Sequence, residues 1–114
     1  MIETVVIKYL SEQMSVPVYG EVPEDFPLTF VTVEKTGSFT ENYIVTCTLA
    51  IQSWAGTQYE AAQLNAEVKN LMQGLLELDS ISKVKCTTDY NFIDTTTKRD
   101  RYQAVFDVVY YEEN

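Results

Sequence analysis

The sequence predicts an α+β protein: a mostly antiparallel sheet of four or five strands with two helices packed on one face. Two segments space their apolar residues by threes and fours, as helices do, and several others alternate apolar with polar residues, as strands do. The strands come in two pairs that flank the longer helical segment, an order typical of α+β domains. A chain of 114 residues is ordinarily one domain, so we expect residues 1–114 to fold together.

The first expected element is a short amphipathic helix over residues 2 to 13. Its apolar residues recur at helical spacing: Ile2, Val5, Val6, Tyr9 and Leu10. Pro17 ends this helix and leaves residues 16 to 19 as a short edge strand, because proline has no N–H to give to a strand pair. Residues 20 to 27 are rich in turn-forming residues and predict a loop.

The first strand pair is expected at residues 28 to 35 and residues 43 to 53, joined through a turn at residues 36 to 38. The first of these strands is apolar on both faces, which predicts that it is covered on both sides. Its apolar residues are Phe30, Val31 and Val33. The second strand alternates, and its inward positions are Tyr43, Val45, Cys47, Leu49 and Ile51.

A long helix follows, with Thr57 as its expected N-cap. The Thr57 hydroxyl can accept a hydrogen bond from a first-turn N–H, and Glu60 can complete a capping box. One apolar stripe predicts that this helix lies on the sheet: Ala61, Leu64, Val68, Leu71, Met72, Leu75 and Leu78. Gly74 falls on the opposite, polar side of this pattern.

The second strand pair is expected at residues 81 to 90 and residues 102 to 111. In the first of these strands, one face should carry Val84, Cys86, Thr88 and Tyr90. In the second, one face should carry Tyr102, Ala104, Phe106, Val108 and Tyr110. The polar residues 94 to 100 between them have no apolar anchor, and we expect a mobile tip there.

Composition excludes several classes of function. The chain has 17 acidic and 8 basic residues, a net charge of −9, which disfavours direct binding to nucleic acid as the main activity. It has no histidine, and no catalytic, cofactor-binding or metal-binding constellation is recognisable. The expected protein is therefore not an enzyme. It has no leader or membrane-spanning run, so we expect a soluble intracellular protein without a membrane partner.

Two residue types allow alternative interpretations. Cys47 and Cys86 both fall at inward strand positions, where free thiols are favoured over a disulfide. Trp54 lies between the end of a predicted strand and the start of the long predicted helix. We favour a structural residue that closes this junction over an anchor for a binding partner.

Opposite charges concentrate on two different elements. Acidic residues follow the polar side of the long helix, and five of the eight basic residues fall in the last strand pair. Such runs are usually solvated faces, but opposite signs on two elements would suit a head-to-tail contact between copies. The candidate interface residues are Glu60, Glu67, Glu77, Lys83, Lys85, Lys98, Arg99 and Arg101.

Several short motifs suggest a family. They are Val22-Pro23, the run Phe-Val-Thr-Val-Glu-Lys-Thr-Gly at residues 30 to 37, Ser53-Trp54-Ala55 at a strand end, Thr57 with Glu60-Ala61-Ala62 at a helix start, and a tyrosine-rich closing strand. With these motifs the chain resembles the tail terminator, or tail completion, proteins of long-tailed bacteriophages and prophages. That family commonly has an arginine-rich strand after its glycine turn, whereas this chain continues Ser38-Phe39-Thr40-Glu41.

The resemblance implies a virion structural protein without catalysis or cofactor. Copies would assemble, in the host cytoplasm, into a ring, a hexamer, that caps the head-proximal end of the tail tube. Its partners would be the tail tube protein and the head-tail connector protein, and DNA would pass through its lumen without specific binding. The alternatives are a head-to-tail connector or other neck protein and, in a different class, a small intracellular ligand-binding domain or enzyme. A deep apolar pocket would favour the last.

Overall fold

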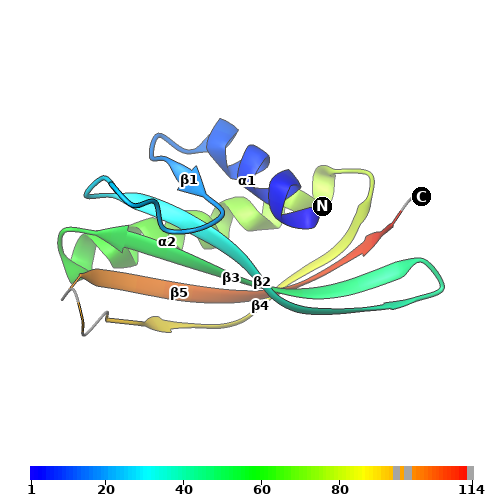
Figure 1. Ribbon diagram of the computed structural model, residues 1–114. Coiled ribbons are helices and arrows are strands. Elements are labelled where there is room, and N and C mark those ends of the chain that lie inside the picture. The colour runs from blue at the N-terminus through cyan, green and yellow to red at the C-terminus, as the bar shows by residue number, and fades with distance from the viewer. Residues whose placement is uncertain (94–95, 97–98, 113–114) are drawn as a thin grey trace.

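The protein is an α+β fold in which two helices and a five-stranded, mostly antiparallel sheet pack together, as the sequence predicts (Figure 1). The computed structural model describes residues 1–93, 96 and 99–112. In chain order the elements are α1 (Ile2–Gln13), β1 (Val18–Tyr19), β2 (Phe30–Glu41), β3 (Ile44–Ala55), α2 (Gln58–Gln73), the 3-10 helix η1 (Gly74–Glu77), β4 (Ile81–Asn91) and β5 (Asp100–Tyr111). The strand order is β1-β2-β3-β5-β4.

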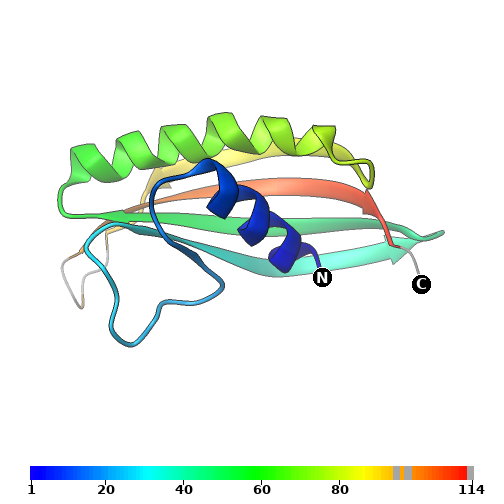
Figure 2. The same ribbon diagram turned by 90° about the horizontal axis from the view of Figure 1, so that it is seen from above.

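Both helices lie over the same face of the sheet (Figure 2). The long helix α2 packs on β3, β5 and β4, and α1 packs on β2 and β1 and touches α2. Among the described residues, β1 pairs parallel to its neighbour β2, and the other three strand pairs are antiparallel. The core between the helices and the sheet includes Val6, Leu10, Val68, Met72, Leu49, Ile51 and Phe106.

The start of α2 confirms the predicted cap. The Glu60 N–H donates to the Thr57 Oγ1 at 3.1 Å, and the Thr57 hydroxyl donates to the Glu60 carboxylate at 3.1 Å. The second bond differs from a standard capping box, in which the carboxylate accepts from the N-cap backbone N–H. The predicted apolar stripe is also confirmed, since Ala61, Leu64 and Val68 are buried against the sheet.

The predicted turn at residues 36 to 38 is wrong. β2 continues through these residues to Glu41, and its register with β3 shifts between Lys35 and Gly37. Gly37 therefore belongs to a bulge instead of a reversal. The chain reverses at Asn42 and Tyr43, whose φ angles are 53° and 65°. Positive φ at both central residues is the requirement of a two-residue type I′ hairpin turn.

The predicted face of β4 is correct at its start and wrong at its end. Val84 and Cys86 point toward the helices, but the register with β5 shifts between Cys86 and Thr88. One extra residue in a strand moves every later side chain to the other face. Asp89 therefore points toward α2, while Thr88 and Tyr90 lie on the face without helices.

Gly74 does not lie on an open polar side. It stands where α2 passes into η1, and a Cβ there would overlap the hydroxyl oxygen of Tyr9. The Tyr9 hydroxyl donates to the Leu71 carbonyl at 2.7 Å and so ties α1 to the end of α2. Contact with α1, which helical spacing alone does not reveal, determines the environment of Gly74.

Candidate interaction surface

The face of the sheet opposite the two helices is the candidate functional surface, and we call it the open face. Residues paired directly across neighbouring strands point to the same side of a sheet. The register therefore assigns β4, β5 and β3 side chains to the open face in rows such as Lys83, Val109 and Thr46. In the part of the chain that the structure describes, no helix covers this face.

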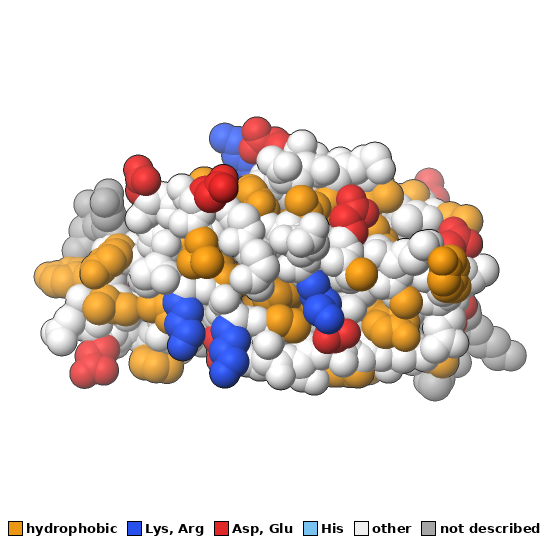
Figure 3. All heavy atoms as spheres, turned by 180° about the vertical axis from the view of Figure 1, so that it is seen from behind, with side chains coloured by type: hydrophobic (Ala, Val, Ile, Leu, Met, Phe, Trp, Pro, Cys, Tyr) orange, Lys and Arg blue, Asp and Glu red, His pale blue; other side chains and the backbone are white. Residues whose placement is uncertain are grey.

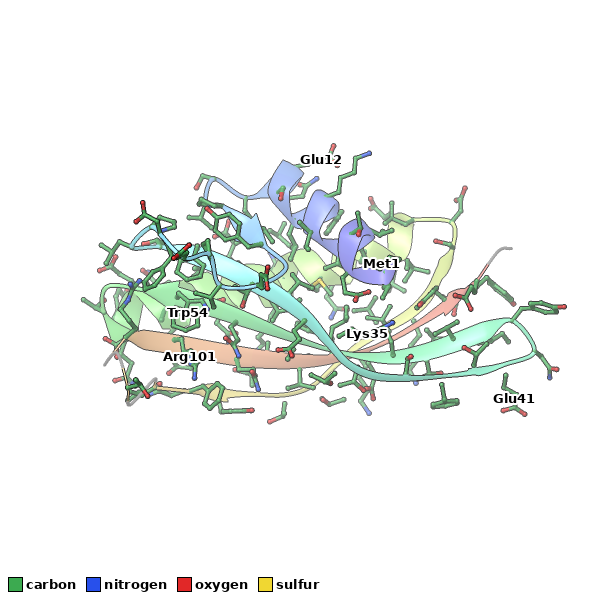
Figure 4. The ribbon with its side chains drawn as sticks, in the orientation of Figure 1. Met1, Glu12, Lys35, Glu41, Trp54 and Arg101 are labelled. Atoms are coloured by element: carbon green, nitrogen blue, oxygen red, sulfur yellow. The ribbon has the colours of Figure 1, made fainter. Side chains whose placement is uncertain are left out.

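At the end of the open face where β3 meets α2, aromatic rings and an arginine side chain pack on one another (Figure 4). The Trp54 ring stacks on the Phe30 ring with centroids 5.3 Å apart. On its other side, the Arg101 guanidinium carbon lies 4.7 Å from the Trp54 centroid and 4.1 Å from the Phe92 centroid. The Arg101 Nε also donates to the Phe92 carbonyl at 2.7 Å. Trp54 is 4% exposed, which favours the structural interpretation of this residue over the anchor.

Hydrogen bonds between side chains occupy the middle of the open face. The Gln52 Nε2 donates to the Gln103 Oε1 at 2.8 Å, and the Gln103 Nε2 donates to the Tyr90 hydroxyl. Two rows further along the open face, the Thr48 hydroxyl donates to Asp107 at 3.2 Å. These polar groups are satisfied within the chain, so this region has less to offer a partner than the two ends.

The end of the open face beside the β2–β3 turn is apolar and exposed. We call this set the turn-end patch: Phe39 (63% exposed), Tyr43 (66%), Ile44 (39%) and Tyr111 (56%). Ile44 and Tyr111 are direct cross-strand partners. A shallow hollow of about 180 Å³ lies here, lined by Phe39, Glu41, Asn42, Ile44 and Thr46. Clustered exposed aromatic residues of this kind mark interaction sites.

The predicted interface residues divide between the two layers of the molecule. Glu60, Glu67 and Glu77 are exposed on α2 and η1. Lys83 and Lys85 are exposed on the open face, beyond the sheet. The fold therefore does not bring the predicted acidic residues and the predicted basic residues together within one chain. It places them on opposite sides of the molecule.

Arg99 and Arg101 make contacts within the chain. The Arg99 Nη2 donates to the Leu28 carbonyl at 2.6 Å, and its guanidinium carbon lies 4.8 Å from the centroid of the Phe26 ring. Arg101 sits between two aromatic rings, as described above. These two arginines hold the loop before β2 and the end of β4, which leaves fewer free donors for a partner. Lys98, and most of the predicted mobile tip, lie outside the described residues.

Burial raises the pKa of the Cys47 thiol to about 11, with Lys35 lowering it and Glu3 raising it to smaller extents. The pKa of Cys86 is also raised, first by burial and then by the charge of Asp89. Both cysteines are free, as the sequence favours. A raised pKa keeps a thiol protonated at neutral pH and so less nucleophilic.

The surface also carries a larger depression beside α1. A depression of about 370 Å³ lies between α1 and β2, and it is lined by Met1, Glu3, Thr4, Ile7, Gly20, Val33, Glu34 and Lys35. Among the described residues, no group of three or more His, Cys, Asp or Glu is placed to hold a metal ion. Within the same residues, no helix is long and apolar enough to cross a membrane.

Sequence reasoning missed the turn-end patch. The alternating pattern gives no role to Phe39, and the predicted inward strand position of Tyr43 is wrong, because Tyr43 lies in the turn and is exposed. The available signal was Asn42, because asparagine readily takes the left-handed conformation that a hairpin turn needs.

No protein-family model matches the chain, and a search of curated proteins finds no match.

Proposed function

We propose that this protein is a structural subunit of a long-tailed bacteriophage or prophage tail, of the tail terminator type. Copies form a ring, a hexamer, that caps the head-proximal end of the tail tube and joins it to the head connector. Two supports carry the proposal. One is the set of sequence motifs described above, and the other is the placement of the predicted acidic and basic interface residues on opposite sides of the molecule.

The charge division suits a head-to-tail contact. The carboxylates Glu60 and Glu67 lie on the outer side of the helix layer, and Lys83 and Lys85 lie on the open face. Two different surfaces of one chain can then meet between successive copies. Such heterologous contacts close into a ring when the rotation between neighbours permits it. A single exposed ion pair contributes roughly 0 to 1 kcal/mol, so the charges orient the copies more than they hold them.

The net charge of −9 fits the proposed position in the tail. DNA must slide through the lumen of such a ring without sticking to it. A wall that carries excess negative charge repels the phosphate backbone, and repulsion of this kind acts over roughly a Debye length, about 8 Å at physiological salt.

The test is assembly on a defined substrate. The purified full chain is mixed with isolated tail tubes of its own phage or prophage and imaged by negative-stain electron microscopy. Its mass in solution is measured by light scattering at high concentration. We expect rings in solution or caps at one end of each tube. A chain that stays monomeric at all concentrations and leaves the tube ends bare would overturn the proposal.

A further inference from the structure

Two strands of the sheet each leave one backbone edge without a partner strand. β4 is the outermost strand on one side of the sheet, and Figure 2 shows β2 toward the other side. The outer partner of β2 is β1, which is only two residues long and pairs with Val31 and Thr32. Within the described part of the chain, no strand pairs with the outer edge of β2 from Val33 to Glu41 or with that of β4. Edges of this length are templates for pairing with another chain.

The hydrogen bonds of β2 show which of its residues face this free edge. The Val31 N–H donates outward, to the Pro17 carbonyl at 2.9 Å. Because the backbone groups of an antiparallel strand point alternately to its two sides, Val33 and Lys35 face outward too. The bulge after Lys35 shifts the alternation by one residue, and the two-residue turn after Glu41 requires Glu41 to bond to β3. The outward residues of the free edge are therefore Val33, Lys35, Ser38 and Thr40.

β4 has an outward set of the same kind. The Phe92 N–H donates to the Arg101 carbonyl at 2.8 Å. At the other end of β5, the Tyr111 N–H donates to the Ser80 carbonyl at 3.0 Å. β5 pairs with β3 without interruption, so its odd-numbered residues all face β4, and their partners in β4 face inward. The inward partners are Lys83, Lys85, Thr88 and Tyr90, and the outward residues are Val84, Cys86, Asp89 and Asn91.

The two outward sets have the same spacing in opposite directions. Upward from Val33 and downward from Asn91, the outward residues follow at intervals of two, three and two, because each stretch contains one bulge. β2 and β4 also run in opposite directions, since three antiparallel pairs connect them. An antiparallel pairing with Val33 opposite Asn91 and Thr40 opposite Val84 would therefore match every outward residue of one edge with an outward residue of the other.

The exposed charges of the two edges are opposite in this pairing. On the helix side of the sheet, Lys35 would stand opposite Asp89, and on the open face Glu41 would stand opposite Lys83. All four residues are exposed. Figure 3 views the molecule from the β4 side, where Lys and Arg side chains gather in the lower half of the face. Opposite charges of this kind select the partner and set its register.

Two further pairs on the open face agree with this pairing. Glu34 would stand opposite Tyr90, whose hydroxyl accepts from the Gln103 Nε2 and keeps its own proton to donate. Lys85 would stand opposite Phe39, which is 63% exposed, and the apolar stem of a lysine can cover such a ring.

The other charges near the two edges lie outside these pairs or already have a partner. Asp89 pairs with Lys69 at 2.9 Å, so its carboxylate would lie between two lysines. Asp107 lies one strand further in, on β5, and accepts a hydrogen bond from β3. The Glu112 N–H donates to the β2–β3 turn from the side of β5, away from the free edge. Asp79 precedes β4.

We propose that β4 of one copy pairs with the free edge of β2 in the next copy and so continues the sheet from chain to chain. The contact joins two different edges, so it is heterologous and can close into a ring. The helices then lie on one side of the continued sheet and the open faces on the other. The inference rests on the proposed function, because it names the surfaces through which the ring forms. Lys83 meets Glu41 of the neighbour in this contact, in place of the carboxylates of α2.

A mixing experiment tests the pairing of unlike edges. The β2-edge variant carries Glu34→Lys and Glu41→Lys, and the β4-edge variant carries Lys83→Glu and Lys85→Glu. Each variant then has like charges on the open-face side of both edges, so its association constant at low salt should fall by at least about tenfold. A mixture of the two restores opposite charges at every junction and should assemble as the wild type does, with the two chains alternating.

Light scattering measures assembly, and native mass spectrometry counts the two chains in the mixed assemblies. The matched control carries Glu12→Lys and Glu24→Lys, which change the net charge as the β2-edge variant does but lie away from both edges. This control should assemble like the wild type. Edge variants that assemble alone like the wild type, or a mixture that stays unassembled, would overturn the inference.

Thr40→Pro tests the backbone hydrogen bonds of the contact. Because Thr40 faces outward, proline removes a donor from the edge and no bond to β3. Thr40→Ala keeps the N–H and is the matched control. Both variants should show similar circular dichroism and melting, and proline should lower the association constant by about fivefold relative to alanine. Equal assembly of the two would contradict the pairing. The charge variants change no backbone group and test the same contact if proline disturbs the hairpin.

Other outcomes distinguish this contact from the proposed ring. If both edge variants alone form rings on tail tubes, the inference fails and the ring stands. If the wild type forms edge-dependent oligomers in solution but never caps a tube, this contact stands and the proposed ring fails. If Glu60→Lys with Glu67→Lys prevents rings while the edge variants still form them, the copies meet through α2 and the inference fails.

Discussion

Tyr9 and Gly74 show how one close contact determines a residue choice. The Tyr9 hydroxyl donates to the Leu71 carbonyl, in the last turn of α2, and occupies the space that a Cβ on Gly74 would need. Glycine ordinarily weakens a helix relative to alanine by roughly 1 kcal/mol. Here that penalty is offset by a hydrogen bond between the two helices, which contributes a similar amount.

Gly74→Ala is therefore expected to destabilise the protein, by about 1 kcal/mol, although alanine is the better helix former. The new methyl group must displace the Tyr9 ring and break its bond to Leu71. Chemical denaturation measures the change in the free energy of unfolding. Tyr9→Phe supplies the control: without the hydroxyl, the same Gly74→Ala change should be neutral or stabilising. Equal effects in both backgrounds would contradict the proposed overlap.

The raised pKa of the Cys47 thiol predicts that the protein loses stability at alkaline pH. Its folded pKa is about 11, raised mainly by burial from an ordinary value of 9.0. As pH rises above 9.0, the unfolded chain loses the thiol proton while the folded chain retains it. The free energy of unfolding should then fall, by about 1.4 kcal/mol per pH unit, until pH approaches the folded pKa. Below the unfolded pKa this contribution is constant.

The measurement is a series of denaturation curves between neutral and alkaline pH. Cys47→Ala should be less stable at neutral pH, because it leaves a small gap in the core, but its stability should fall less steeply as pH rises. Slopes of wild type and variant are compared, because tyrosine and lysine side chains titrate in both. Parallel slopes would show that the thiol does not titrate differently in the folded state.

At the scale of elements, the start of α2 is determined locally. Thr57 has extended backbone angles, and its hydroxyl accepts the Glu60 N–H. Thr57→Ala should cost about 1 kcal/mol of stability, because a first-turn N–H loses its partner. Thr57→Ser keeps the oxygen and should cost much less. Thermal melting compares the three chains, and equal losses for Ala and Ser would contradict a capping role.

The end of β4, unlike the start of α2, is not determined locally. The face of the sheet on which its side chains lie depends on the neighbouring strand. The bulge after Cys86 turns Asp89 toward α2, where it accepts from Asn65 and pairs with Lys69 at 2.9 Å. It also turns Tyr90 onto the open face, beside Gln103. The sequence pattern does not locate this bulge, because Thr87, Thr88 and Asp89 are all polar and leave neither face with an apolar residue that would show the shift.

At the scale of the whole molecule, the charge division predicts salt-dependent assembly. Lys83→Glu should reduce the assembled fraction, and more strongly at low salt, where exposed charges are less screened. Lys8→Glu is the matched control, because it makes the same change in net charge on the exposed side of α1. Light scattering across a salt series measures both. An equal effect of the two variants would attribute the loss to net charge and not to the open face.

Local sequence patterns are enough to predict the α+β class, the two helices, the capped start of α2 and the inward residues of β3 and β5. Each of these follows from a local period or a local hydrogen bond, which residues a few positions apart can encode. It also placed the acidic and basic candidates on different elements.

Four features depend on the folded chain: the place where β2 turns, the facing of the end of β4, the glycine at position 74, and the contacts of Arg99 and Arg101 within the chain. The physical reason is common to all four. Each depends on atoms brought together from distant parts of the chain: β3 across the hairpin, β5 across the second bulge, Tyr9 at the end of α2, and the rings of Phe26, Trp54 and Phe92 around the arginines. The turn-end patch emerged for the same reason, because the true position of the turn exposes Phe39 and Tyr43.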